Sequence, residues 1–139
     1  MTLPNDCFEI HNISAFPLIR FCSERAGTGY AVQWQREMEA LLAHGTPFAI
    51  LYTAAHGEET QEDRKLRAIW LKQNRAALAR LCCGLASVEP DATRRAALQQ
   101  MAQGAMRAFG VKQIVTATEA EALNTLLQDL RDHDEGAEN

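Results

Sequence analysis

The sequence predicts an α/β protein whose elements follow in the order ββαβαβαβα. Two observations carry this prediction. Continuous apolar runs, such as residues 47–53, are typical of strands buried on both faces, and segments with helical apolar spacing separate them. Strands that alternate with helices imply right-handed crossovers. We therefore expect a four- to five-stranded, mainly parallel sheet with an antiparallel N-terminal edge hairpin and helices packed on it.

The first two predicted elements are short strands near the N-terminus. Residues 8–13 alternate apolar and polar side chains, and residues 17–22 form a second short run of β-forming residues. Only Ser14, Ala15 and Phe16 separate the two runs. The pair is therefore predicted to be a hairpin at one edge of the sheet.

The first predicted helix begins near Tyr30, and its apolar stripe is Trp34, Met38, Leu41 and Leu42. Gly45 suits the left-handed position after a helix, and Pro47 cannot continue one. The helix is therefore expected to end before the buried strand over residues 47–53.

A capping box from Thr60 to Asp63 predicts the start of a second helix. We expect this helix to continue to about Cys83, with Gly84 just beyond its C-terminus and a short strand over residues 85–88. Cys82 and Cys83 would then act as small hydrophobic residues at the end of the helix, with reduced thiols.

The last third of the chain repeats the alternation. Asp91 is a predicted cap for a helix that ends at Gly110, and residues 111–116 hold the next strand. A second capping box starts at Thr118, and the final helix has leucines at helical spacing. Residues 132–139 are acidic and unpatterned, so we predict a disordered tail there.

The chain of 139 residues fits one domain, predicted over residues 1–131. Its net charge of −4 equals the charge of the four acidic residues in the tail, so the domain itself is close to neutral. No strong basic excess points to nucleic acid, and no apolar run approaches the ~20 residues of a membrane span. With no visible secretory signal, we expect a cytoplasmic protein.

Sequence motifs offer one weak catalytic candidate. His56 and Glu58 follow the strand over residues 47–53, where ligands of parallel sheets usually bind, and the two side chains could transfer a proton. Acidic residues at this position are also expected for capping of the next helix alone. No hydrolase, nucleotide or metal-binding motif occurs, and we expect no cofactor and no metal site.

The second predicted helix carries six basic residues against Glu62 and Asp63. One interpretation is a solvated polar face with Trp70 packed on the sheet. The other is a groove or partner surface formed by Arg67, Trp70 and Asn74, because arginine and aromatic residues are enriched at interfaces.

Three segments resemble the SpoIIAA-like, STAS-related domains over roughly residues 47–127. They are Arg67-Ala68-Ile69-Trp70-Leu71-Lys72-Gln73-Asn74-Arg75, Cys82-Cys83-Gly84-Leu85-Ala86-Ser87-Val88 and Val115-Thr116-Ala117-Thr118-Glu119-Ala120-Glu121-Ala122-Leu123. In that group, tryptophan and asparagine lie four residues apart, a strand begins Gly-x-Ala, and the next helix lies near an arginine, which Arg94 or Arg95 would match.

This resemblance implies a small α/β sandwich with a four- or five-stranded sheet, but it does not imply one activity. Classical members carry a phosphorylatable serine before a helix, but residues 53–57 read Thr-Ala-Ala-His-Gly. Other relatives resemble lipid carriers with an apolar cavity between helices and sheet. Such a cavity would be lined here by Met38, Trp70, Met101, Met106 and Phe109.

Three functions follow from the sequence. The first is a non-catalytic STAS-like regulatory or protein-interaction module that lacks the serine motif. The second is a carrier of a small apolar ligand or lipid, and the third is a small enzyme using His56 and Glu58. The candidate binding residues are His56, Arg67, Trp70, Asn74 and Met106. The partner is an unidentified protein or small apolar ligand, and the edge of the 8–13 strand or the last helix could support a homodimer.

Overall fold

A computed structural model describes residues 8–22, 25–52 and 60–138, with side chains described through His133. The described elements are β1 (His11–Asn12), β2 (Leu18–Phe21), α1 (Ala31–His44), β3 (Phe48–Tyr52), α2 (Gln61–Gln73), α3 (Arg75–Leu81), β4 (Cys82–Val88), α4 (Ala92–Phe109), β5 (Gln113–Thr116) and α5 (Glu119–Glu138). The predicted α/β fold class and the order of strands and helices are confirmed, with the second predicted helix divided into α2 and α3.

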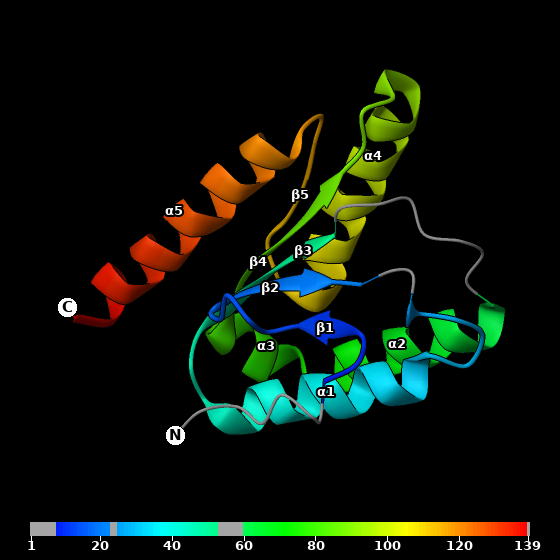
Figure 1. Ribbon diagram of the computed structural model, residues 1–139, viewed down its shortest axis with the longest axis horizontal. Coiled ribbons are helices and arrows are strands. Elements are labelled where there is room, and N and C mark those ends of the chain that lie inside the picture. The colour runs from blue at the N-terminus through cyan, green and yellow to red at the C-terminus, as the bar shows by residue number, and fades with distance from the viewer. Residues whose placement is uncertain (1–7, 23–24, 53–59, 139) are drawn as a thin grey trace.

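The five strands form one sheet in the order β1-β2-β3-β4-β5. β1 and β2 pair antiparallel, and every later pair is parallel. Each parallel strand lies directly beside the preceding one, so right-handed crossovers place all the connecting helices on the same face. Figure 1 shows this arrangement, with α1 to α4 on one side of the sheet and α5 on the other.

Two apolar clusters hold the layers together. The larger one packs α1, α2 and α3 against one face of the sheet through residues such as Trp34, Leu41 and Leu78. The smaller one packs α5 against the other face through Ala122, Leu126 and Leu130. Alternate residues of β3 serve the two clusters, since Ile50 belongs to the first and Leu51 to the second, as a strand buried on both faces requires.

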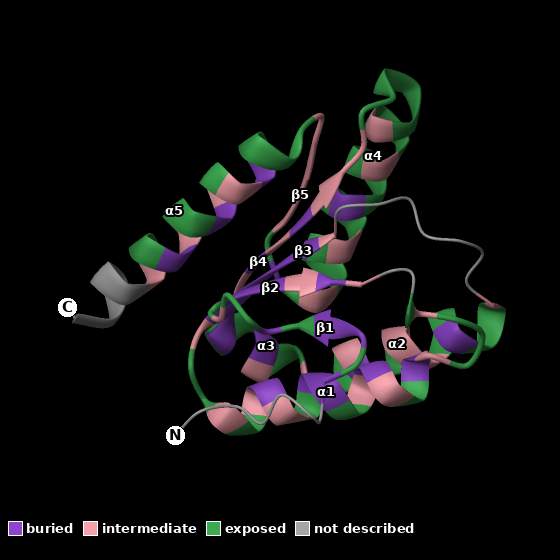
Figure 2. Cartoon of the chain, viewed as in Figure 1, coloured by how far each residue is buried: buried purple, intermediate pink, exposed green. Residues whose placement is uncertain are grey.

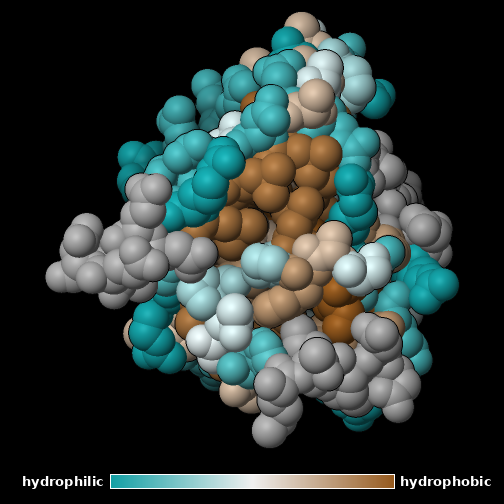
Figure 3. Space-filling view, turned by 60° about the vertical axis from the view of Figure 1, so that its left-hand side comes forward, coloured by the Kyte–Doolittle hydropathy of each residue, from teal (hydrophilic) through white to brown (hydrophobic). Residues whose placement is uncertain are grey.

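On the α5 side, the packing leaves hydrophobic surface in view. Leu127 of α5 is 44% exposed. Turned so that this side comes forward, the molecule shows a hollow of hydrophobic residues framed by hydrophilic ones (Figure 3). Within the described part of the chain, no helix combines the length and apolar character needed to cross a membrane.

The predicted extent of the second helix is wrong. The helix breaks at Asn74, and its second part, α3, ends at Leu81. The Asn74 side chain donates a 2.9 Å hydrogen bond to the Trp70 carbonyl, which closes α2, and α3 starts at the next residue. Cys82 therefore begins β4, and Gly84 lies inside that strand rather than after a helix. A Cβ at Gly84 would stand only 3.1 Å from Asp129 Oδ2 of α5, so glycine here permits close helix–sheet packing.

α5 continues to Glu138, through residues for which the sequence predicts a disordered tail. Two contacts attach the start of this segment. Gln128 Nε2 donates a 2.8 Å hydrogen bond to Asp132 Oδ1, and His133 Nε2 lies 2.8 Å from the Arg80 carbonyl oxygen. No proline interrupts the segment, so the helical hydrogen-bond pattern can extend along it.

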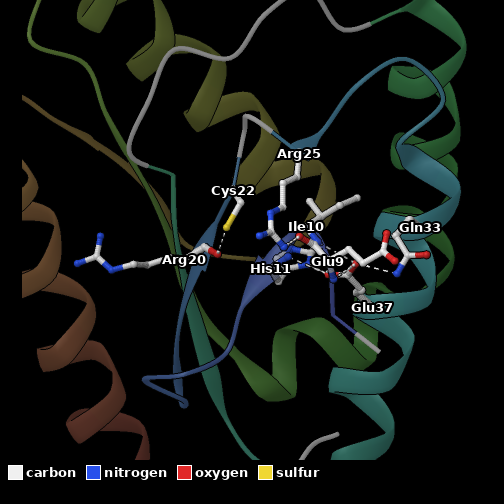
Figure 4. Close-up of polar contacts among 8 residues, drawn as sticks. All are labelled: Glu9, Ile10, His11, Arg20, Cys22, Arg25, Gln33 and Glu37. Carbon is white, nitrogen blue, oxygen red and sulfur yellow. Dashed lines mark hydrogen bonds and ion pairs between the residues drawn. The ribbon is translucent and has the colours of Figure 1, made fainter. Parts of the chain in front are cut away.

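A buried carboxylate joins the N-terminal strand to α1. Glu37 accepts hydrogen bonds from the backbone N–H groups of Glu9, Ile10 and His11 and from Gln33 Nε2 (Figure 4). Burial opposes the charged form of Glu37, but these hydrogen bonds and the His11 side chain outweigh it and lower the pKa to about 2. Glu37 is therefore an ionised anchor inside the protein.

Candidate functional site

A pocket of about 260 Å³ lies between α2 and α4 over the sheet, and we call it the α2–α4 pocket. The helices line it with Arg67, Leu71, Leu98, Met101, Ala102, Ala105 and Phe109. The strands line it with Phe21, Tyr52, Leu85, Ser87, Gln113, Ile114 and Val115. Its volume is near the lower end of the range for small-molecule sites.

The pocket exists because α4 does not fill the space above the sheet. Ala102 and Ala105 stand between Leu98 and Phe109 on the face that lines the pocket, and their side chains are too small to close it. Ala102 is the only described residue of this 18-residue helix that is buried. Figure 2 shows the contrast with α1, which has several buried residues.

The apolar surface of α4 is correspondingly open. Met101 is 70% exposed although it lines the pocket. A cluster of open hydrophobic side chains in a concave site is typical of surfaces that bind another molecule.

A smaller cavity of about 30 Å³ adjoins the first. The smaller one is also lined by Trp34 and Met38, and the two share Tyr52, Arg67, Leu71, Leu85, Phe109 and Gln113. Its volume corresponds to roughly one water molecule. The empty space therefore extends from the open pocket toward the main core.

Arg67 is the only charged residue among the described residues that line the α2–α4 pocket. Its Nη1 donates a 3.1 Å hydrogen bond to the Tyr30 hydroxyl, and its Cζ lies 5.4 Å from the centre of a Trp34 ring. These contacts with α1 and the residue before it position the guanidinium beside the pocket.

The buried Asp63 carboxylate lies one turn before Arg67 on α2. It accepts hydrogen bonds from Gly29 N at 2.8 Å, Ala31 N at 3.2 Å and the Thr60 hydroxyl at 3.0 Å. Burial opposes its charge, but these hydrogen bonds and the Arg67 charge hold the pKa of Asp63 below its ordinary value. Asp63 therefore fixes the start of α2 against the start of α1.

Among the described residues that the sequence analysis proposes for binding, only Arg67 lines the pocket. Trp70 is 3% exposed and packs edge-to-face on Trp34, with Nε1 donating to Glu39 Oε1 at 3.2 Å. Asn74 closes α2 as described above, and Met106 is 36% exposed outside the pocket lining. His56 and Glu58 lie outside the described residues.

The cavity lining proposed from the sequence is partly reproduced. Met101 and Phe109 line the α2–α4 pocket and Met38 the smaller cavity. Sequence reasoning did not assign Ser87 and Gln113 to the cavity. Their signal is a polar residue within or beside a buried strand, a position usually taken by an apolar side chain.

Within the described residues, no three His, Cys, Asp or Glu side chains gather as a metal site would require. The fold and pocket thus define an α/β protein with an open, largely apolar cleft between two crossover helices. Comparisons with known protein families, with curated proteins and with solved structures found no match for this chain.

Proposed function

We propose that this protein is a non-catalytic binding protein that carries a small apolar ligand in the α2–α4 pocket. The observation that carries the proposal is the open apolar face of α4 above the sheet, where Met101 is 70% exposed and Leu98 and Phe109 are half-buried. A ligand in the pocket would remove these side chains from water, and burial of apolar surface stabilises a complex by about 25 cal/mol per Å² before the costs of association.

Methionine methyl NMR tests this proposal directly. With ¹³C-methyl methionine, titration with decanol or decanoate is expected to shift the Met101 signal. Met106 lies on the same helix outside the pocket lining and serves as the internal control. Equal shifts of both signals would indicate non-specific binding to α4, and no shift of Met101 with either compound would contradict the proposal.

The protein-interaction module favoured by the sequence stays an alternative proposal, and the titration separates the two. A pocket that takes neither compound would favour the interaction module. Membership of the STAS-related group, a cytoplasmic location and a homodimer remain proposals that rest on the sequence patterns. A catalytic role for His56 and Glu58 also remains a proposal. A His56→Ala protein that keeps full biological activity would contradict it.

A further inference from the structure

The described polar groups that line the α2–α4 pocket are either neutral or positively charged. Ser87 and Gln113 belong to β4 and β5, and Arg67 belongs to α2. None of the described residues that line the pocket carries a carboxylate. The described lining of the pocket therefore presents hydrogen-bonding groups and the positively charged Arg67.

The nearest acidic residue along α2, Asp63, lies close enough to Arg67 for the two charges to attract, but its carboxylate makes its hydrogen bonds outside the pocket lining. Its two carboxylate oxygens face the N–H groups of Gly29 and Ala31 and the hydroxyl of Thr60. The lowered pKa of Asp63 keeps it ionised in that position. Asp63 thus organises the start of α2 and does not contribute an acceptor to the described lining of the pocket.

Arg67 is held in place by contacts outside α2. The Tyr30 hydroxyl and the Trp34 ring both contact the guanidinium, so its position is set by α1 and the residue before it as well as by α2. A guanidinium in such a setting binds carboxylate or phosphate oxygens with well-defined geometry, and charge-assisted hydrogen bonds are roughly twice as strong as neutral ones. The surrounding apolar walls lower the local dielectric and strengthen the attraction.

The size of the pocket limits the apolar part of the ligand. A volume of about 260 Å³ holds roughly nine groups the size of a water molecule. The open face of α4 allows a longer chain to continue past Met101 toward solvent. A medium-length aliphatic tail therefore fits the walls.

We propose that the ligand of the α2–α4 pocket is an amphipathic anion, with one carboxylate or phosphate group bound by Arg67 and an aliphatic tail against α4. This inference rests on the proposed function and specifies its ligand class. Ser87 and Gln113 supply neutral hydrogen bonds beside the anionic group.

Three probes with the same ten-carbon tail test the inference: decanoate, decyl phosphate and decanol. Isothermal titration at 150 mM salt, below the micelle-forming concentrations of the two anions and the solubility limit of decanol, is expected to show at least tenfold tighter binding of one or both anions than of decanol. The tighter anion identifies the headgroup as carboxylate or phosphate, and equal binding of both supports the shared anionic chemistry. Decanol binding as tight as both anions would overturn the inference while leaving the proposed function intact. No binding of any probe would overturn both.

Variants of Arg67 test whether its positive charge binds the anionic group of the ligand. Arg67→Gln is expected to weaken binding of the preferred anion about tenfold and leave decanol binding within twofold, whereas Arg67→Lys retains part of the preference. Lys72→Gln removes the same charge from an exposed position of α2 outside the pocket lining, and it should bind like the wild type. Unchanged anion binding by folded Arg67→Gln would overturn the role of Arg67. If Arg67→Gln does not fold, Arg67→Lys is compared with the wild type instead. The role of Arg67 would then be overturned if the two proteins had identical affinities for all three probes and neither preferred the anions.

Discussion

The Nδ1 atom of His11 lies 2.9 Å from Oε1 of Glu37, and both side chains are fully buried. Three consecutive backbone N–H groups, those of Glu9, Ile10 and His11, converge on the same carboxylate. An acidic residue of α1 thus supplies the acceptor for these N–H groups, while the Ile10 carbonyl accepts a 2.7 Å hydrogen bond from Cys22 N beside β2. Since each buried donor needs an acceptor, Glu37 stabilises the N-terminal edge of the sheet alongside the pairing of β1 with β2.

Glu37→Gln is expected to destabilise the protein by about 3 kcal/mol, because the amide presents a donor to a site built from donors. Chemical denaturation monitored by tryptophan fluorescence measures this loss. Glu62→Gln, at an exposed position of α2, is the control and should cost less than about 1 kcal/mol. A Glu37→Gln protein as stable as the Glu62→Gln control would contradict the anchor role.

The same carboxylate predicts a dependence of stability on pH. The pKa of Glu37 is lowered from 4.5 to about 2 in the folded protein. Its contribution is therefore fully present above the unfolded value and is lost as the pH falls from 4.5 toward 2. The free energy of unfolding should fall more steeply over this range in the wild type than in Glu37→Gln. Parallel curves for the two proteins would show that Glu37 is not the group responsible.

Cys82 is expected to resist alkylation in the native protein. Burial is the main cause that raises the pKa of its thiol to about 12, so the reactive thiolate is scarce at pH 8. Cys83 is only half-buried. Tandem mass spectrometry after a short iodoacetamide pulse should find the label on Cys83 before Cys82, and denaturant should remove the difference. Faster native labelling of Cys82 would disprove its burial.

Two glycine substitutions should act in opposite directions. Alanine at Gly84 would bring its Cβ to 3.1 Å from Asp129 Oδ2, and Asp129 is itself held by Lys112 at 2.8 Å. We expect Gly84→Ala to cost about 1–2 kcal/mol through this overpacking. Gly104→Ala meets open space within α4 and should stabilise the protein by about 0.5–1 kcal/mol. Thermal unfolding of both variants checks the signs, and a stabilising Gly84→Ala would contradict the close packing of β4 and α5.

Local sequence patterns suffice for most of the fold. Gly45 and Gly110 end α1 and α4 in the left-handed conformation, as their positions predict. The end of the second predicted helix does not follow from such patterns. Gly84 resembles a helix-ending glycine in sequence, and only the approach of α5, more than 40 residues later, shows that β4 needs it.

The candidate site is harder to predict because it depends on the placement of two helices. The sequence predicts a binding surface that contains both Arg67 and Trp70, yet Arg67 lines the pocket and Trp70 is a core residue beside Trp34. The pocket arises where Ala102 and Ala105 face the sheet without filling the space. An alanine in an apolar helical stripe gives the same sequence pattern whether the neighbouring space in the structure is filled or empty.

Occupation of the α2–α4 pocket is tested most directly by a pair of tryptophan substitutions on α4. Ala105 lines the pocket, whereas Ala108 is exposed outside the lining. Decanoate titrations of the wild type, Ala105→Trp and Ala108→Trp compare the same change in side chain on one helix. Binding by the wild type and Ala108→Trp, with at least a tenfold loss in a folded Ala105→Trp, is the predicted result. Equal decanoate affinity in all three proteins would contradict binding in the pocket.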